Sequence, residues 1–253
     1  MANKKALLLP EVSLSDQGPV RHLHLDSIWI QGSMRVAAPY ELVHEYIQRM
    51  MAWLLFTDPD TVPSLQSLQL GLGAGSLTKF CARVLRMHNS TAIEINPQVL
   101  GACRGWFKLP EDSAQLQVVL GDASEQIRLP RWQQAVDALQ VDLYDEEAAG
   151  PVFDSSAFYA DCRQTLRPGG CMTVNLFGRS SSFQTSVQHL GAAFGMDAIW
   201  AFKATREGNT VLLAQRTPSR PARALLQERA EIIKARWGLP ADKWVRVFKP
   251  VLA

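Results

Sequence analysis

The chain has 253 residues, of which 47% are hydrophobic and 20% charged, and its formal net charge is +2. This length fits one large domain, or one domain with a small addition, and the composition is that of a globular protein with a sizeable core. The near-neutral charge argues against a nucleic-acid partner, and no apolar run approaches the roughly 18 residues of a membrane-spanning helix. The four cysteines show no C-x-x-C spacing, which favours reduced thiols in a cytoplasmic protein without a metal site.

Residues 1–38 predict a small β appendage. Residues 12–31 fit short strands, and residues 21–26 alternate polar and apolar as a half-buried hairpin would. The alternation places His22 and His24 on one face of a strand, and without a further ligand nearby they do not indicate a metal site. Apolar residues at spacings of three and four over residues 40–56 then predict a helix with one buried face.

Residues 39–216 are predicted to form one domain in which strands and helices alternate. The predicted strands of this domain are residues 65–72, 91–95, 116–120, 135–143, 171–175, 196–203 and 210–215. Helices are expected between most of them, including one over residues 76–87 and one that begins at Asn96-Pro97. This order predicts an α/β fold with a doubly wound, seven-stranded, mostly parallel sheet and one reversed edge.

Residues 217–253 are predicted to form a C-terminal helical tail. Its helix, over residues 220–237, carries one apolar stripe made of Leu225, Ala230, Ile233 and Trp237. Such a stripe packs against the domain or against a second copy of the chain, so a homodimer is one expectation.

Three glycines alternate where the first strand of the main domain ends: Gly71, Gly73 and Gly75. Glycine tolerates the positive φ of a tight turn and lets the backbone approach a ligand closely. A strand, a glycine-rich turn and a helix N-terminus together form a nucleotide-binding element in doubly wound folds. Alone, the pattern also fits a plain turn, so the residues downstream decide its meaning.

Each of the next three predicted strands leads to a carboxylate: Glu94, Asp122 and Asp142. Glu94 lies 23 residues after Gly71 (94 − 71), near the spacing of about twenty that suits a carboxylate binding ribose hydroxyls. Any one of these groups could be a solvated loop charge. Three in order, beside the glycines, predict an adenosine-type ligand at the carboxyl ends of the strands.

Residues 142–147 contain four carboxylates, which repel one another unless a cation neutralises them. A solvated loop explains Glu146 and Glu147. Asp142 differs, because an apolar strand carries it to the edge of the site, where it could orient an attacking amine and accept its proton.

With these motifs, residues 12–215 resemble the spermidine synthase family, the polyamine aminopropyltransferases. The glycine loop and the Leu-Arg-Pro-Gly-Gly sequence at residues 166–170 are shared with class I methyltransferases in general. The motifs specific to aminopropyltransferases are Gln31, the pair His44-Glu45, and Asp142 with Asp145 in an Asp-x-x-Asp arrangement. Shorter matches occur at residues 93–95, 121–122 and 158–159.

The resemblance implies a class I methyltransferase-like Rossmann fold and a transferase. Decarboxylated S-adenosylmethionine would donate an aminopropyl group to a small-molecule amine such as putrescine, leaving methylthioadenosine. By the family pattern, the nucleoside is held by Gln31, Gly71, Gly73, Gly75, Glu94, Asp122 and Ala123. His44 and Asp145 would hold the amine, and Asp142 would be the base. An alkylammonium has a pKa near 10, so it needs such an acceptor before it can attack.

The chain also departs from the family pattern. Ala74 stands where the family usually has an aspartate that binds the cationic propylamine, a contact of about 1.5 to 3 kcal/mol. Val43 replaces a tyrosine, and Leu143 and Tyr144 replace small serines. Two alternatives therefore remain open: a methyltransferase that uses intact S-adenosylmethionine, whose carboxylate an aspartate at residue 74 would repel, and a non-catalytic nucleoside-binding member.

Overall fold

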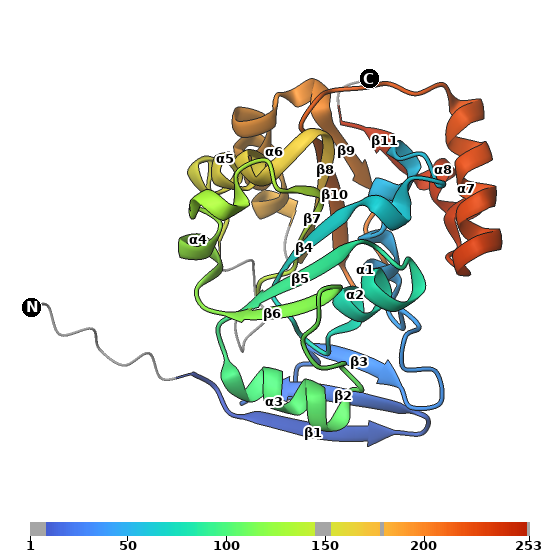
Figure 1. The fold of residues 1–253 in the computed structure, drawn as a ribbon. Helices are drawn as coiled ribbons and strands as arrows, with labels where there is room; N and C mark the ends of the chain where they lie inside the picture. Colours follow the sequence, from blue (N-terminus) through green and yellow to red (C-terminus); the bar gives the residue numbers. More distant parts are fainter. Residues whose placement is uncertain (1–8, 145–152, 178–179, 252–253) are drawn as a thin grey trace, which may run out of the picture.

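The computed structural model describes residues 9–144, 153–177 and 180–251 (Figure 1). Within these residues the strands form two sheets, one of three strands and one of eight. The eight-stranded sheet has the order β11-β9-β10-β8-β7-β4-β5-β6. The three-stranded sheet lies below it in Figure 1, beside helix α3 (Pro97–Trp106).

The N-terminal sheet confirms the predicted hairpin and adds a strand to it. It consists of β1 (Val12–Gln17), β2 (Val20–Leu25) and β3 (Gly32–Arg35), with both outer strands antiparallel to β2. Leu23 and Met34 are buried and pack in one apolar cluster with Cys103 and Phe107 at the end of α3. The sheet is therefore joined to the main domain by a shared core.

Five strands of the main sheet run parallel. They are β4 (Gln66–Leu70), β5 (Asn89–Glu94), β6 (Leu116–Leu120), β7 (Val136–Val141) and β8 (Leu166–Phe177). β4 pairs with β5 on one side and with β7 on the other, so the chain changes direction across the sheet at β4. Ligands of doubly wound folds bind at this point, outside the carboxyl ends of the strands.

The other edge of the sheet holds one strand more than predicted. β10 (Asn209–Gln215) is antiparallel to β8 and to β9 (Ile199–Phe202), as a reversed edge requires. β11 (Phe248–Pro250), from the tail that was predicted as helical, then pairs with β9 and makes the eighth strand. Main-chain pairing with the exposed edge of β9 gives the end of the tail an extended conformation.

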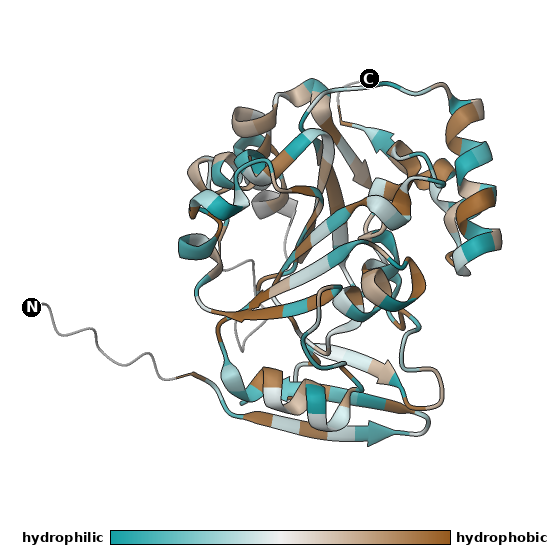
Figure 2. Ribbon diagram, viewed as in Figure 1, coloured by the Kyte–Doolittle hydropathy of each residue, from teal (hydrophilic) through white to brown (hydrophobic). Residues whose placement is uncertain are grey.

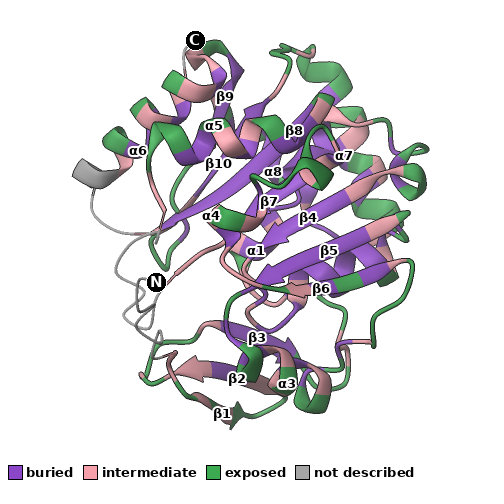
Figure 3. Ribbon diagram, turned by 60° about the vertical axis from the view of Figure 1, so that its left-hand side comes forward, coloured by how far each residue is buried: buried purple, intermediate pink, exposed green. Residues whose placement is uncertain are grey.

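Helices α4 (Ala123–Gln126), α5 (Ser156–Thr165) and α6 (Ser180–Phe194) complete the alternation on one side of the sheet (Figure 1). β4, β7 and β8 are buried along most of their length in Figure 3, because both faces of the sheet are covered. No helix among the described residues has the length and apolar character needed to cross a membrane.

Two predicted helices are shorter than expected. Residues 40–56 form only α1 (Glu45–Arg49) followed by a 3-10 turn, Ala52–Phe56. All residues from Met50 to Leu55 are buried, so this stretch fills the core as tight turns and has no solvent face. Residues 76–87 form α2 (Ser76–Lys79), which widens into a π-helical turn, Phe80–Val84.

The tail packs on the domain through α7 (Arg223–Trp237) and α8 (Ala241–Val247). The buried stripe of α7 contains Leu226, with Ala230 and Ile233, whereas the predicted Leu225 is 38% exposed. Figure 2 shows the resulting bands of apolar and polar residues along α7. Arg229 donates a hydrogen bond of 2.9 Å to the carbonyl oxygen of Leu55, which ties the helix to the 3-10 turn.

A lysine is buried where α2 meets α3. The Lys79 ammonium group donates a 2.6 Å hydrogen bond to the carbonyl oxygen of Phe107, just past the last turn of α3. The negative end of a helix dipole favours a cation in this position. Burial nevertheless lowers the pKa of Lys79 to about 8, because the charged form has lost its hydration.

We expect the burial of Lys79 to make stability rise with pH. Its pKa is about 8 in the folded chain and 10.5 in the unfolded chain, so the unfolded chain binds more protons between these values. The free energy of unfolding should therefore increase by about 2 kcal/mol between pH 8 and pH 10, relative to the variant Lys79→Met. Urea titrations of both proteins over this pH range measure the difference. If the free energies of unfolding of the two proteins changed with pH in the same way, the pKa of Lys79 would not be lowered in the folded chain.

Candidate active site

The glycine loop lies at the carboxyl end of β4, and all three glycines have positive φ: +89° at Gly71, +50° at Gly73 and +67° at Gly75. Gly75 directly precedes α2. A Cβ atom on Gly71 would lie 2.4 Å from the carbonyl oxygen of Asp142, and one on Gly73 would lie 3.0 Å from that of Gln31. The loop therefore needs glycine for its backbone conformation and for the two segments packed against it.

Glu94 ends β5 and holds the glycine loop. One carboxylate oxygen accepts a 2.9 Å hydrogen bond from the backbone N–H of Leu72, and the other accepts one of 2.8 Å from the N–H of Asn96. Burial raises the pKa of Glu94, and these backbone bonds oppose that rise. A carboxylate offers about four lone-pair sites, so both oxygens can still accept bonds from a ligand.

Asp122 follows β6 and caps α4. One of its oxygens accepts hydrogen bonds from the backbone N–H and the hydroxyl of Ser124, at 2.7 and 2.6 Å. Ala123 begins the helix and is buried. The sequence analysis missed two exposed apolar residues at the ends of the neighbouring strands: Ile95 is 43% exposed and Leu120 is 48% exposed. In the sequence, each could have been found as an apolar residue within two positions of a strand-end acid.

Asp142 follows β7 and lies against β4, because its backbone N–H donates a 3.0 Å hydrogen bond to the carbonyl oxygen of Leu70. Its carboxylate accepts a 3.0 Å bond from the side-chain amide of Asn175, and the Tyr46 hydroxyl lies near it. Burial raises the pKa of Asp142 to about 6, although Asn175 and the Tyr46 hydroxyl lower it. The group is thus an ionised proton acceptor at neutral pH.

Tyr46, which the sequence analysis did not select, supplies a phenol beside Asp142. Val43, where the family pattern has a tyrosine, precedes α1, whereas Tyr46 lies in the first turn of that helix. Burial raises the pKa of Tyr46 well above its usual value, so its hydroxyl stays protonated and can donate to the carboxylate.

His44 immediately precedes α1, and its ring stacks on that of Tyr46 with 5.9 Å between the centroids. Its Nε2 is 2.7 Å from the hydroxyl oxygen of Ser33, which is also 2.7 Å from Nδ1 of the buried His22. Burial lowers the pKa of His44. The Tyr46 ring therefore contacts His44 on one face, and its hydroxyl lies near the Asp142 carboxylate.

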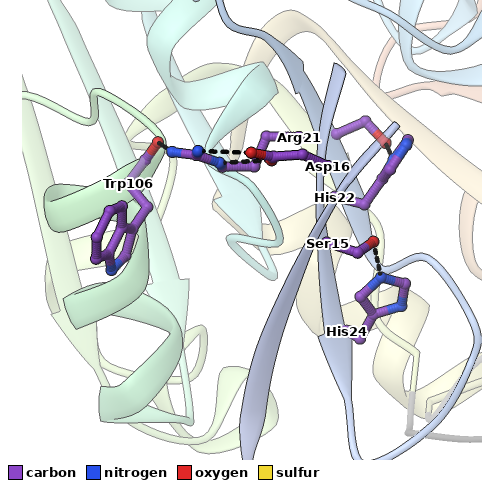
Figure 4. A network of polar contacts seen from close by, with 7 residues as sticks. Ser15, Asp16, Arg21, His22, His24 and Trp106 are labelled. Atoms are coloured by element: carbon purple, nitrogen blue, oxygen red, sulfur yellow. Dashed lines mark hydrogen bonds and ion pairs between the residues drawn. The ribbon is translucent and has the colours of Figure 1, made fainter. Parts of the chain in front are cut away.

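The N-terminal sheet contributes its own polar network, which Figure 4 shows around His22 and His24. The two histidines lie on one face of β2, as predicted, with 6.5 Å between their ring centroids. His24 pairs with the hydroxyl of Ser15, and Arg21 is bound by both oxygens of Asp16. These partners account for both histidines without a metal ion.

Gln31 connects the N-terminal sheet to the glycine loop. Its backbone N–H donates to Leu23, and its carbonyl oxygen faces Gly73. The next residue, Gly32, lies so close to Ala74 that a Cβ atom would be 2.5 Å from the Ala74 nitrogen. Ala74 is 2% exposed and belongs to the apolar cluster shared with the sheet, so its methyl group faces β3.

The acidic sequence after β7 is described only up to Tyr144. Asp145, with Glu146 and Glu147, lies outside the described residues. Tyr144 turns back onto β8, where its hydroxyl donates a 2.8 Å hydrogen bond to the carbonyl oxygen of Asn175.

The sheet order, the glycine loop and the strand-end carboxylates define a class I methyltransferase-like fold. A scan against models of known protein families found no match. The chain is 32% identical to a polyamine aminopropyltransferase from Chromobacterium violaceum over 241 residues, which are 95% of this chain and 90% of that relative. This similarity covers nearly all of both proteins. The chain belongs to the polyamine aminopropyltransferase family, which is a family of transferases.

Two solved structures support the fold. A probable spermidine synthase from Corynebacterium glutamicum has a TM-score of 0.70 at 19% identity, and the match covers 93% of this chain and 88% of that one. Human Methyltransferase-like protein 13, in complex with SAH, also has a TM-score of 0.70, at 23% identity over 78% of this chain and 93% of that one.

We expect Gly32→Ala to destabilise the protein by about 1 to 3 kcal/mol, because the added methyl group overlaps the backbone of Ala74. The backbone of Gly32 itself does not require glycine, so the loss would come from the contact alone. Gly101→Ala, in α3, is the control, because its Cβ atom meets open space and alanine favours a helix. Thermal unfolding of both variants measures the effect. Equal melting temperatures would contradict the proposed close docking of β3 on the loop.

Proposed function

We propose that this protein transfers an aminopropyl group from decarboxylated S-adenosylmethionine to a small amine such as putrescine, with Asp142 as the base. The observation that carries the proposal is the position of Asp142. The backbone carbonyl of Asp142 packs directly against Gly71 of the glycine loop, and its carboxylate, whose pKa burial raises, accepts a hydrogen bond from Asn175. Family membership supports aminopropyl transfer as the reaction.

The nucleoside half of the proposed site consists of groups at the ends of β4, β5 and β6. Glu94 is the acceptor for the ribose hydroxyls, and the glycine loop lets the donor approach the backbone. Asp122, Ala123 and Gln31 complete this half. The exposed apolar side chains of Ile95 and Leu120 offer surfaces for the two faces of a flat adenine ring.

In the proposed reaction, the Asp142 carboxylate accepts a proton from the ammonium group of the acceptor. The neutral amine then attacks the propyl carbon bound to the sulfonium. A C–N bond forms as the C–S bond breaks, and methylthioadenosine leaves with the electron pair on sulfur. His44 and Asp145 hold the amine, and alignment of the two substrates supplies most of the acceleration.

Ala74 favours a second candidate, a methyltransferase that uses intact S-adenosylmethionine. The methyl group of Ala74 is packed against Gly32, so this position supplies no charge for the propylamine end of a decarboxylated donor. The carboxylate of the intact donor would meet no repulsion here. The partly buried Asp142 remains unexplained by this candidate, because methyl transfer does not in itself require a polycation site.

We expect calorimetry to separate the candidates. The aminopropyltransferase should bind methylthioadenosine and decarboxylated S-adenosylmethionine about tenfold or more tightly than the intact donor, since the described groups of the site are acidic and would repel a carboxylate. Spermidine should then form from putrescine. Tighter binding of the intact donor, with no spermidine formed, would favour the methyltransferase, and no binding of any nucleoside would refute both.

The variant Asp142→Asn should lower the transfer rate by about 10² to 10⁴-fold, because the amide cannot accept the proton. Binding of methylthioadenosine should remain within about twofold. Asp60→Asn is a suitable control, since this carboxylate is exposed and pairs with Arg236 in the tail. An unchanged rate in Asp142→Asn would rule out this residue as the base.

The rate should also depend on pH in one direction. With a pKa of about 6, the Asp142 carboxylate is protonated and inactive as a base at low pH. We expect the rate constant for transfer to fall about tenfold per pH unit below pH 6 and to level off above pH 7. Single-turnover measurements at saturating substrates test this profile, and a rate that is flat between pH 5 and pH 7 would contradict it.

A further inference from the structure

We propose that Asn175 and Asn209 are positioning residues that together hold the Asp142 carboxylate in one orientation for proton transfer. This inference rests on the proposed function, because it assigns Asp142 the role of base. Neither asparagine carries a charge that could titrate. They act through the direction in which their side-chain amides point.

The chain of contacts runs across three strands. The side-chain amide nitrogen of Asn175, on β8, donates a 3.0 Å hydrogen bond to Oδ1 of Asp142, which follows β7. The amide nitrogen of Asn209, on β10, donates a 3.1 Å bond to Oδ1 of Asn175. Asn175 is 3% exposed, so little water can replace either bond.

The register of the sheet places these side chains together. Asn209 is opposite Phe177, and Val211 is opposite Asn175, so the two asparagines are diagonal neighbours on one face of the β8–β10 pair. Such neighbours are within reach of each other. Asn209 is fixed in turn at the start of β10, where its backbone N–H donates to the hydroxyl of Thr205.

This order of donors decides which way the Asn175 amide points. Because Asn209 presents an N–H to Asn175, the oxygen of the Asn175 amide faces Asn209 and its nitrogen faces Asp142. If the Asn175 amide turned over, its oxygen would face the carboxylate and repel it. Asn209 therefore controls the donor at Asp142 without contacting Asp142 itself.

Other groups also face this carboxylate. The hydroxyl of Tyr46 reaches it from α1, with the His44 ring stacked behind, and Glu207 in the turn before β10 acts on His44. Tyr144 is also close enough for Asp142 and Asp154 to raise the pKa of its hydroxyl. The tyrosines stay neutral at physiological pH because burial raises their pKa values, so the asparagine pair provides a donor that is independent of any titration.

The variants Asn175→Leu and Asn209→Asp test the proposal. The leucine removes the donor, while the aspartate at residue 209 attracts the Asn175 N–H and turns its oxygen toward Asp142. We expect both to move the acid limb of the single-turnover pH profile upward by about one pH unit, because the ionised form of Asp142 loses a hydrogen bond. In Asn209→Ala the side-chain amide of Asn175 can adopt either orientation, so this variant should produce a smaller upward shift.

Thr173→Val is the matched control. Thr173 lies two residues before Asn175 on the same face of β8, and its hydroxyl bonds to the carbonyl oxygen of Met50. The loss of this bond lowers stability without touching the asparagine pair, so the acid limb should not move. A merely structural role for Asn209 would leave the acid limb of the uncharged variant Asn209→Ala at its wild-type position, whereas positioning moves it upward.

A second measurement does not depend on turnover. The carboxyl carbon of Asp142 can be followed by NMR in protein labelled with ¹³C-aspartate and assigned by its disappearance in Asp142→Asn. Its titration midpoint should rise in Asn175→Leu and Asn209→Asp. Unmoved midpoints in both variants would overturn the positioning role. If the variants show these shifts but the wild-type protein transfers no aminopropyl group, the proposed function is refuted and the positioning of Asp142 by the asparagines stands.

Discussion

The site depends on the contact between Gly71 and the backbone of Asp142. β4 and β7 are neighbours at the place where the sheet changes direction, and the Asp142 N–H continues their pairing by donating to Leu70. Just after this bond, the backbone segments that follow β4 and β7 lie too close together for any side chain at residue 71. This approach places the proposed proton acceptor beside the proposed nucleotide-binding turn, so one backbone contact joins two segments that lie 71 residues apart in sequence (142 − 71).

The N-terminal sheet acts on the same loop from the other side. Its strand β3 begins at Gly32, whose missing side chain leaves room for Ala74, and the carbonyl oxygen of Gln31 faces Gly73. Glu94 then fixes the loop from β5 through the N–H of Leu72. The glycine loop is thus held by β3, β5 and the end of β7, which suits a binding element that must not change shape when a ligand arrives.

The sequence was sufficient for the parts of the fold that local chemistry determines. Asn96 caps α3 as expected from Asn-Pro, and Gly238 ends α7 in the left-handed conformation. Contacts between residues far apart in the sequence could not be predicted from local patterns. β11 exists because β9 has a free edge, and the stretch from Met50 to Leu55 departs from a regular helix because its surroundings bury every residue. Neither cause is encoded in a local pattern.

The same distinction explains the site. Glu94, Asp122 and Asp142 were predictable because parallel strands end at one edge, so their order in sequence implies proximity. Tyr46 and Asn175 were not, because each reaches Asp142 only through the folded arrangement of α1 and β8.

Ala74 requires a different explanation, because no carboxylate replaces it in the described part of the loop. Its methyl group is one side of the contact with Gly32, so the identity of residue 74 is coupled to how closely β3 approaches. A short N-terminal sheet packed tightly on the loop leaves no room there for a larger, charged side chain. In the proposed reaction, the charge that holds a cationic substrate must then come from elsewhere, and Asp142 is the described acidic group at the end of β7. The close packing of β3 on the loop and the uncharged residue at position 74 are in this view one structural adjustment.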